Sequence, residues 1–344
     1  MIRILICEDS RAYTAALVRM LEHDGGITVV ATCGSAEDAI AALPAVRPDI
    51  VVMDIGLPGM DGLQATEEIM GTRPLPILVL LSTVANRRHV AAAALAAGAL
   101  DALAKDDLDL SAPASAAAAA VRERIKMLGR AHVLRHPRAR LRVTAPAQDA
   151  TSRRASVIGV CASTGGPAIL AHLLEALPAD YPIPLLVVQH ISPSFTDGLA
   201  SWLGQAIRVP VRVVADGAQA DPGVWIAPQG AHTVLNATGR LHLEQRLAPG
   251  RHQPSGDVLF VSIVAAAGKS GVAVVLSGMG SDGASGAAAV QRAGGLAIAQ
   301  DEATSAIYGM PKAAVDAGVK VVLSPTMIAS RLLGLRWEPL VSAR

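Results

Sequence analysis

Three residues that could perform nucleophilic catalysis follow separate apolar segments in the second half of the chain. Ser163 follows "SVIGVCA", His190 follows "PLLVVQ", and Asp282 lies in the glycine-rich stretch "SGMGSDGASG". A serine becomes a nucleophile when a base takes its proton, and that base needs an acid to orient it. If the preceding segments are strands of one parallel sheet, their carboxyl ends share an edge and the three side chains meet there.

The turn "CASTGGP" that carries Ser163 has more than one interpretation. Two glycines between a strand and a helix can cradle a phosphate, or they can bend the chain so that a serine projects. A phosphate-binding loop needs a lysine or a third glycine, and the turn has neither. Pro167 suits the first turn of a helix, whose free N–H groups can stabilise an oxyanion. Taken singly, His190 and Asp282 are more often structural, so the catalytic hypothesis depends on all three residues together.

A second group of polar residues follows apolar segments in the first half. Glu8 and Asp9 follow "IRILIC", and Asp54 ends "DIVVMD"; Ser82 and Lys105 end two later segments. Three carboxylates at one edge repel each other unless a cation joins them, and oxygen ligands suit Mg²⁺. Asp54 could then attack a phosphoryl group whose oxygens are bound by the hydroxyl and the ammonium. Any one of the acids alone is better explained as a helix cap.

Alternating strands and helices predict an α/β fold with two doubly wound parallel sheets. Helices are expected from residues 10 and 35, with Ser10 and Ser35 as N-caps, and "HTVLNATGRLHL" predicts a β-hairpin that turns at Gly239. The predicted strands of the first half are 2–7, 27–33, 49–54, 76–82 and 99–105. Those of the second half are 155–161, 183–189, 210–215, 223–227, 271–277, 294–299 and 319–323.

Residues 126–154 have no clear period and are basic, which predicts a linker between domains at 1–125 and 155–344. Its arginines and histidines could contact nucleic acid, but a solvated linker is the favoured interpretation. Thirty basic and 29 acidic side chains give the whole chain a net charge of +1. This balance argues against nucleic acid as a partner.

The three cysteines, Cys7, Cys33 and Cys161, are spaced for neither a disulfide framework nor a zinc site. They predict buried, reduced thiols in a cytoplasmic protein. No apolar run reaches the ~18 residues of a membrane span, so direct membrane insertion is not expected.

Residues 1–125 resemble the receiver domain of two-component response regulators, on the motifs "EDS", "MDIGLPGMDG", "LLST" and "GALDALAK". The resemblance implies a flavodoxin-like fold and phosphorylation of Asp54 by a histidine kinase. It implies Mg²⁺ bound by Glu8, Asp9, Asp54 and the carbonyl of Gly56, a switch hydroxyl on Ser82, and a phosphoryl partner in Lys105. Asp106 stands where the family usually has Pro, and Ala102 stands where it usually has an aromatic residue near the fifth strand that changes rotamer on activation.

Nearly the whole chain resembles the chemotaxis protein-glutamate methylesterases, which join a receiver to a larger, Rossmann-like effector with a small hairpin. The motifs are "CASTGGP", "VVQHI", "WIAPQGAH", "PSGDVLFVS", "SGMGSDGASG" and "AQDEATSAIYGMP". The resemblance implies hydrolysis of glutamate γ-methyl esters on chemoreceptors and deamidation of certain receptor glutamines, without a cofactor. It makes Ser163 the nucleophile, His190 the base and Asp282 its orienting acid, with the N–H groups of Thr164 and Met279 as the oxyanion hole.

One departure from the family lies in "PSGD", where Gly256 replaces the usual Val and is expected to loosen the segment. The domain order suggests a hypothesis for regulation, in which the unphosphorylated receiver excludes the receptor helix from the effector's active site. Three alternatives remain open: a phospho-switched binding module with an inactive effector, an esterase for another ester, and a DNA-binding regulator. The DNA-binding alternative is the weakest, because the effector is not basic and has no helix-turn-helix pattern.

Overall fold

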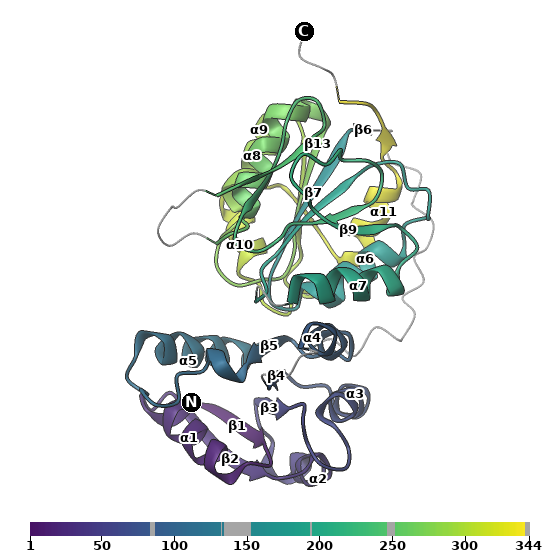
Figure 1. Ribbon diagram of the computed structural model, residues 1–344. Coiled ribbons are helices and arrows are strands. Elements are labelled where there is room, and N and C mark those ends of the chain that lie inside the picture. Colours follow the sequence, from purple (N-terminus) through teal and green to yellow (C-terminus); the bar gives the residue numbers. More distant parts are fainter. Residues whose placement is uncertain (83–86, 132, 134–152, 193–194, 246–251, 341–344) are drawn as a thin grey trace. The chain divides into compact units, whose positions relative to one another are not determined.

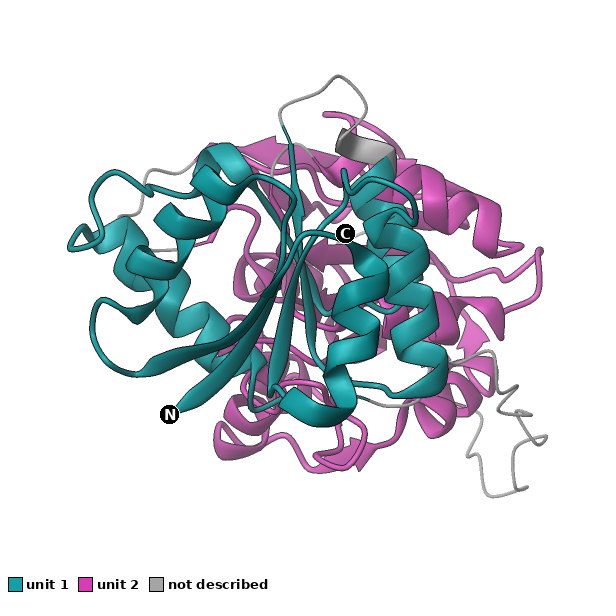
Figure 2. Cartoon of the chain, turned by 90° about the horizontal axis from the view of Figure 1, so that it is seen from below, with its two compact units in different colours: residues 1–139 teal, residues 140–344 magenta. Residues whose placement is uncertain are grey.

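The computed structural model describes residues 1–82, 87–131, 133, 153–192, 195–245 and 252–340. The chain divides into two units, residues 1–139 and 140–344, which Figure 2 shows in two colours. Each unit has its own parallel sheet with helices on both faces. The predicted α/β class with two doubly wound sheets is therefore confirmed.

The first unit contains a five-stranded parallel sheet in the order β2-β1-β3-β4-β5, which is the flavodoxin-like order. Its strands are β1 (Ile2–Cys7), β2 (Ile27–Cys33), β3 (Ile50–Asp54), β4 (Ile77–Leu81) and β5 (Asp101–Ala104). Its helices are α1 (Arg11–Glu22), α2 (Ala36–Val46), α3 (Gly62–Thr72), α4 (Arg87–Ala96), the short 3₁₀ turn η1 (Lys105–Asp107) and α5 (Ala116–Leu128). Helices α1 and α5 cover one face of the sheet, and α2, α3 and α4 cover the other (Figure 1).

Side-chain caps set where several of these helices begin. The hydroxyl of Ser10 accepts from the N–H of Tyr13, and that of Ser35 accepts from the N–H of Asp38. Each serine satisfies one of the backbone donors that a helix leaves free at its N-terminus. The two predicted helix starts are confirmed.

The second unit contains a seven-stranded parallel sheet in the order β15-β14-β13-β7-β8-β10-β9. Its strands are β7 (Val157–Ala162), β8 (Leu185–Gln189), β9 (Val211–Val213), β10 (Val224–Ile226), β13 (Gly271–Val275), β14 (Leu296–Gln300) and β15 (Val321–Leu323). Its helices are α6 (Gly166–Glu175), α7 (Thr196–Ala206), α8 (Gly256–Ala267), α9 (Ala284–Arg292), α10 (Met310–Asp316) and α11 (Pro325–Leu333), with the 3₁₀ turn η3 (Gly268–Ser270). The order of the strands changes direction between β7 and β13, and in such a sheet ligands bind beside that point.

Two small sheets complete the second unit. The predicted hairpin is present as β11 (His232–Leu235) and β12 (Leu241–Glu244), with Gly239 in the left-handed region at its turn. A parallel pair that the sequence pattern did not predict joins β6 (Arg154–Ala155) to β16 (Arg336–Trp337). This pair joins the segment just before β7 to the segment just after α11.

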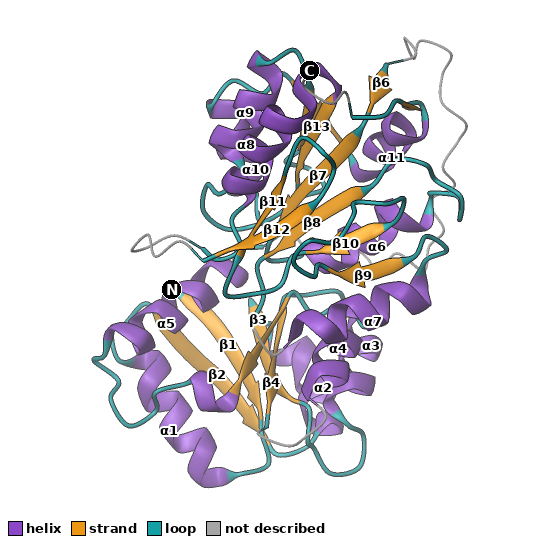
Figure 3. Ribbon diagram, turned by 45° about the horizontal axis from the view of Figure 1, so that its top comes forward, coloured by secondary structure: helices purple, strands orange, loops and turns teal. Residues whose placement is uncertain are grey.

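The large sheet is buried on both faces, so β7 contributes to two cores. Helices α6, α7 and α11 lie on one face of this sheet, and α8, α9 and α10 lie on the other (Figure 3). Ile158 and Val160 pack in the cluster under the first three helices, while Val157 and Cys161 pack in the cluster under the other three. Alternate residues of a strand point to opposite faces, which explains why the segment is apolar at every position.

All the predicted strands are found. Where a predicted end differs from the observed end, the difference is one or two residues. Helix α5 continues to Leu128, and residues 134–152 of the predicted linker lie outside the described part of the chain. The domain limits at 125 and 155 therefore stay predictions. Within the described residues, no helix is both long and apolar enough to cross a membrane.

Candidate functional site

Ser163 and His190 leave neighbouring strands at the same level of the sheet. The last register pair of β7 and β8 is Ala162 with Gln189, and the N–H of His190 donates to the carbonyl of Ala162 at 2.9 Å. The next residue on each strand is Ser163 and His190 respectively. Two parallel strands thus bring the predicted nucleophile and base to one edge, as the sequence pattern predicted.

The turn after Ser163 is held by its glycines and by hydrogen bonds. Gly165 has φ +74° and caps α6, and a Cβ there would lie 2.6 Å from the Cβ of Ala306, so only glycine fits. The carbonyl of Ser163 accepts from the N–H of Gly166 and, at 2.8 Å, from the side chain of Gln189. The turn is therefore fixed by its local sequence and by the neighbouring strand.

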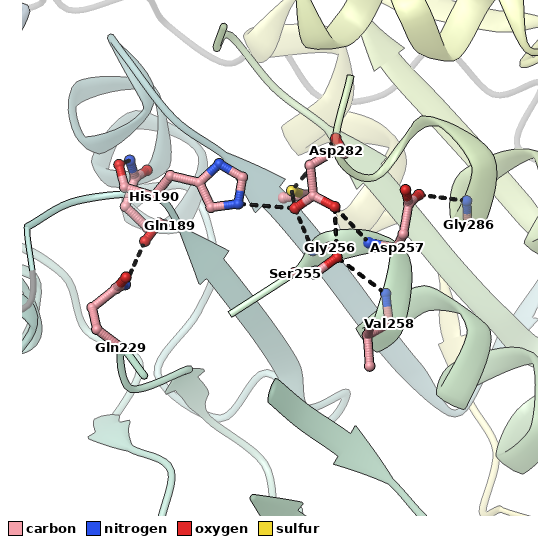
Figure 4. Close-up of polar contacts among 10 residues, drawn as sticks. Gln189, His190, Gln229, Ser255, Gly256, Asp257, Val258, Asp282 and Gly286 are labelled. Atoms are coloured by element: carbon pink, nitrogen blue, oxygen red, sulfur yellow. Dashed lines mark hydrogen bonds and ion pairs between the residues drawn. The ribbon is translucent and has the colours of Figure 1, made fainter. Parts of the chain in front are cut away.

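His190 is paired with Asp282 (Figure 4). Its Nε2 lies 2.9 Å from the Oδ2 of Asp282. Its Nδ1 is buried and has no hydrogen-bond partner among the described residues. When Nε2 donates to the carboxylate, the free Nδ1 is the nitrogen that can take a proton.

The carboxylate of Asp282 is bound by the N-terminus of α8, to which it is tied by three further hydrogen bonds. Ser255 Oγ donates to Oδ1 at 2.6 Å, and the N–H groups of Gly256 and Asp257 donate to Oδ2 and Oδ1 at 2.6 and 3.2 Å (Figure 4). Helix N-termini favour negative charge for this reason. Burial opposes the ionised form, but the bonds from His190, Ser255 and Gly256 outweigh it and hold the pKa of Asp282 well below its usual range.

Gly256 is tightly packed. A Cβ on this residue would lie 2.7 Å from the Cβ of Cys161, and closer still to its sulfur. Cys161 is fully buried, which raises the pKa of its thiol well above the usual value, and its Sγ lies 3.8 Å from Asp282 Oδ2. Cys161 therefore fills the space beside Gly256, and the expected loosening of the segment stays a prediction.

The segment that carries Met279 passes against Ser163. A Cβ on Gly278 would lie 2.6 Å from the Cβ of Ser163. Gly278 is fixed in turn, since its N–H donates to Ile307 and its carbonyl accepts from Met310. Thr164, which directly follows the serine, is buried. Thr164 is thus next to Ser163 in the chain, Met279 directly follows the glycine that packs against Ser163, and their oxyanion role stays a prediction.

Three residues whose side chains hold this site in place were not predicted from the sequence: Ser255, Gln189 and Gln229. Ser255 could have been found as a serine N-cap before the helical run "GDVLF". Gln189 and Gln229 carry no comparable signal: the Gln229 side chain donates to the carbonyl of Gln189 at 3.0 Å, which holds the end of β8 (Figure 4). Amide side chains that bond to a loop backbone are not marked by spacing or composition.

In the first unit, the predicted acids and lysine also meet at the carboxyl edge of the sheet. Lys105 Nζ lies 2.7 Å from Glu8 Oε2 and 3.0 Å from Asp54 Oδ2. Carboxylate oxygens of Glu8, Asp9 and Asp54 lie within 4.8 Å of one another. Ser82 directly follows β4 and is exposed at the same edge.

The charges of this first-unit cluster fit a divalent cation. Burial raises the pKa of Glu8, and the Oδ1 of Asp54 is buried without a hydrogen-bond partner among the described residues. Burial disfavours the charge on Lys105, but its bonds to Glu8 and Asp54 outweigh this and raise its pKa. Gly56 leaves its position open beside Asp54, where an added Cβ would lie 3.6 Å from Oδ2. Mg²⁺ is bound by oxygen ligands, and a buried carboxylate oxygen without another partner is suited to bind it.

Comparison with known proteins finds the same two parts. Residues 158–332 match the family described as CheB methylesterase, and residues 4–110 match the response regulator receiver domain. A protein-glutamate methylesterase/protein-glutamine glutaminase of Anaeromyxobacter dehalogenans is 42% identical over 96% of this chain and 98% of its own length. One of the same name from Myxococcus xanthus is 39% identical over 96% of each chain.

Among solved structures, the CheB methylesterase catalytic domain of Thermotoga maritima is similar to the second unit. It is 34% identical with a TM-score of 0.50, and the match covers 52% of this chain and 97% of that domain. The family match and the near full-length relatives agree with each other. The chain therefore belongs to the CheB methylesterase family and carries a response regulator receiver domain ahead of its methylesterase domain.

Proposed function

We propose that this protein hydrolyses glutamate γ-methyl esters on chemoreceptors, under control of receiver phosphorylation, through Ser163, His190 and Asp282. The observation that carries the proposal is the His190–Asp282 bond of 2.9 Å beside the strand pair that ends at Ser163. His190 Nδ1 has no hydrogen-bond partner among the described residues, and His190 follows the strand next to the one that Ser163 follows, which supports its role as the base. The names of the full-length relatives support the substrate class.

The proposed reaction has two halves. Ser163 Oγ attacks the ester carbonyl while His190 Nδ1 takes its proton, and the oxyanion accepts from the N–H groups of Thr164 and Met279. One such donor is worth about 3 kcal/mol of barrier. The imidazolium then protonates the leaving methoxide, methanol departs, and a water activated by His190 hydrolyses the acyl-enzyme to glutamate.

The same acyl-enzyme explains deamidation. Ser163 would attack the amide carbonyl of a receptor glutamine, and His190 would pass the proton to the amide nitrogen, which leaves as ammonia. Water then completes the reaction as before, and the product is again glutamate. Neither reaction needs a cofactor, because the proton shuttle and the oxyanion donors come from the protein.

We propose that Asp54 accepts a phosphoryl group from a histidine kinase. Glu8, Asp9, Asp54 and the carbonyl of Gly56 would hold Mg²⁺, which neutralises charge on the phosphoryl oxygens when it is bound. Ser82 and Lys105 would bind those oxygens. The Lys105 contacts to Glu8 and Asp54 support this, since they place an ammonium where a phosphate on Asp54 would need one.

The deciding experiment measures methanol release from methylated receptor fragments, with and without a small-molecule phosphodonor and Mg²⁺. The wild-type chain should release methanol, and more quickly with the phosphodonor. Ser163→Ala should abolish release under both conditions, while Asp54→Asn should keep the basal rate and lose the response. Release by Ser163→Ala, or release only from small esters and not from receptor fragments, would overturn the proposal.

A further inference from the structure

The ring of His252 is stacked on the ring of His190. Their centroids lie 4.3 Å apart and their planes differ by 19°. His190 directly follows β8, whereas His252 belongs to the segment just before α8. Flat rings at this separation attract each other, so the contact restrains the rotation of the His190 side chain.

The residues that follow His252 are tied down at two places. Ser255 and Gly256, a few residues later, are bonded to the carboxylate of Asp282. The carbonyl of Gln253 accepts from the N–H of Gly230 at 3.1 Å, and the neighbouring Gln229 is bonded to the end of β8. Because both ties lead to the elements that carry His190 and its acid, the stack is built into the site.

We propose that His252 is a positioning residue for the base: its ring holds the His190 imidazole so that Nε2 stays on Asp282 and Nδ1 stays free. The inference rests on the proposed function, because it assigns His190 as the base of Ser163. His252 acts through His190 and does not itself move a proton.

The charge on His252 suits this role at neutral pH. His252 is an exposed residue, but desolvation of its ring and the neighbouring His190 lower its pKa, and Asp282 opposes them less strongly. These two residues are the charged or titratable groups that act on it within the described chain. A neutral ring over His190 also suits the imidazolium that forms during each half-reaction, since cations are attracted to the face of an aromatic ring.

The first test compares His252→Ala and His252→Phe in the full-length chain by methanol release from methylated receptor fragments. The alanine variant should lower kcat about tenfold with KM nearly unchanged, because misorientation of a catalytic group acts on the chemical step. The phenylalanine variant should restore most of kcat. His242→Ala, at a half-buried histidine of the hairpin that pairs with Asp216, is the control. Equal kcat in the wild-type and alanine chains, or equal losses in the alanine and phenylalanine chains, would overturn the inference.

The second test does not depend on the substrate. NMR of chains labelled with ¹⁵N at histidine should show a hydrogen-bonded Nε2–H proton of His190, identified by its absence in His190→Gln. The signal should persist in His252→Phe and be lost or broadened in His252→Ala; an unchanged signal in all three chains would count against the stack. If the wild-type chain releases no methanol, the proposed function fails and this spectrum alone decides the inference.

Discussion

The space between Gly256 of α8 and Cys161 of β7 has room for only one side chain, and the side chain of Cys161 fills it. A Cβ on Gly256 would lie 2.7 Å from the Cβ of Cys161, and the N–H of the same glycine donates to Asp282 at 2.6 Å. Packing at Gly256 is therefore coupled directly to the acid that orients His190. The sequence departure at this position is compensated within the chain, because a side chain on the neighbouring strand fills the space.

Gly256→Val should reduce both stability and activity. Overpacking of a tight core costs about 1–3 kcal/mol, and the displaced N–H would weaken its bond to Asp282. Adding Cys161→Gly should recover most of both losses, because it vacates the contested space. Urea unfolding and methanol release measured on the four chains of this double-mutant cycle test the coupling.

The control for this cycle is Gly204→Ala in α7. A Cβ there would meet the Cβ of Val211 at 3.8 Å, an ordinary contact. This change should raise stability by up to about 1 kcal/mol, because alanine is the better helix former. Additive losses from Gly256→Val and Cys161→Gly, with no recovery in the double variant, would rule out the shared space.

Ser255→Ala should lower kcat/KM about tenfold as well as destabilising α8. Its hydroxyl both caps the helix and donates to Asp282 at 2.6 Å. Loss of an N-cap costs about 1 kcal/mol of stability. Ser324→Ala is the matched control, since Ser324 caps α11 in the same way. That control should lose similar stability and keep full activity. Equal losses of activity in both variants would show that Ser255→Ala lowers activity only through the loss of stability.

Asp282 should stabilise the fold at neutral pH and lose this effect in acid. Its pKa is depressed in the folded chain, so the ionised form is favoured by folding. The contribution is fully present above the unfolded pKa of about 3.9 and is lost as pH falls toward the folded value. The stability difference between wild type and Asp282→Asn should therefore be largest near pH 7 and shrink below about pH 4. If the difference in free energy of unfolding, measured with urea, stayed constant down to pH 3, the depressed pKa of Asp282 would be contradicted.

Much of this site can be predicted from the sequence, because the register of neighbouring strands determines which residues meet at the edge of the sheet. Ser163 and His190 come directly after paired residues of β7 and β8, so recognising two neighbouring parallel strands is enough to bring them together. The contacts of Ser255 and His252 were not predictable in this way. They depend on which loop the N-terminus of α8 faces, and that is set by packing of α8 on β7 and α9. Helical periodicity identifies the buried face of α8 but not the partner of its first turn.

Lys105→Met should destabilise the receiver in a way that Mg²⁺ reverses. Without the ammonium, Glu8 and Asp54 repel each other at close range, and a bound cation would restore the balance. Lys126→Met is the matched control: its side chain is similarly exposed, at 18% against 16%, but it pairs with Asp24 and Glu123. Calorimetry of the full chain should show Mg²⁺ rescue only for Lys105→Met. If Mg²⁺ restored the stability of both variants equally, it would bind outside the cluster of Glu8 and Asp54.

A chain that starts at Arg153 should exceed the basal methanol release of the unphosphorylated full-length protein, if the receiver excludes the receptor helix. The start point matters because Arg154 and Ala155 form β6, which pairs with Arg336 and Trp337 near the end of the chain. A chain that starts at Ile158 would remove this pair and the bond between Ser156 and Ser270. It should unfold at a lower temperature, which separates loss of inhibition from loss of structure. A rate for the Arg153 chain no higher than that of the unphosphorylated full-length protein would exclude inhibition by the receiver.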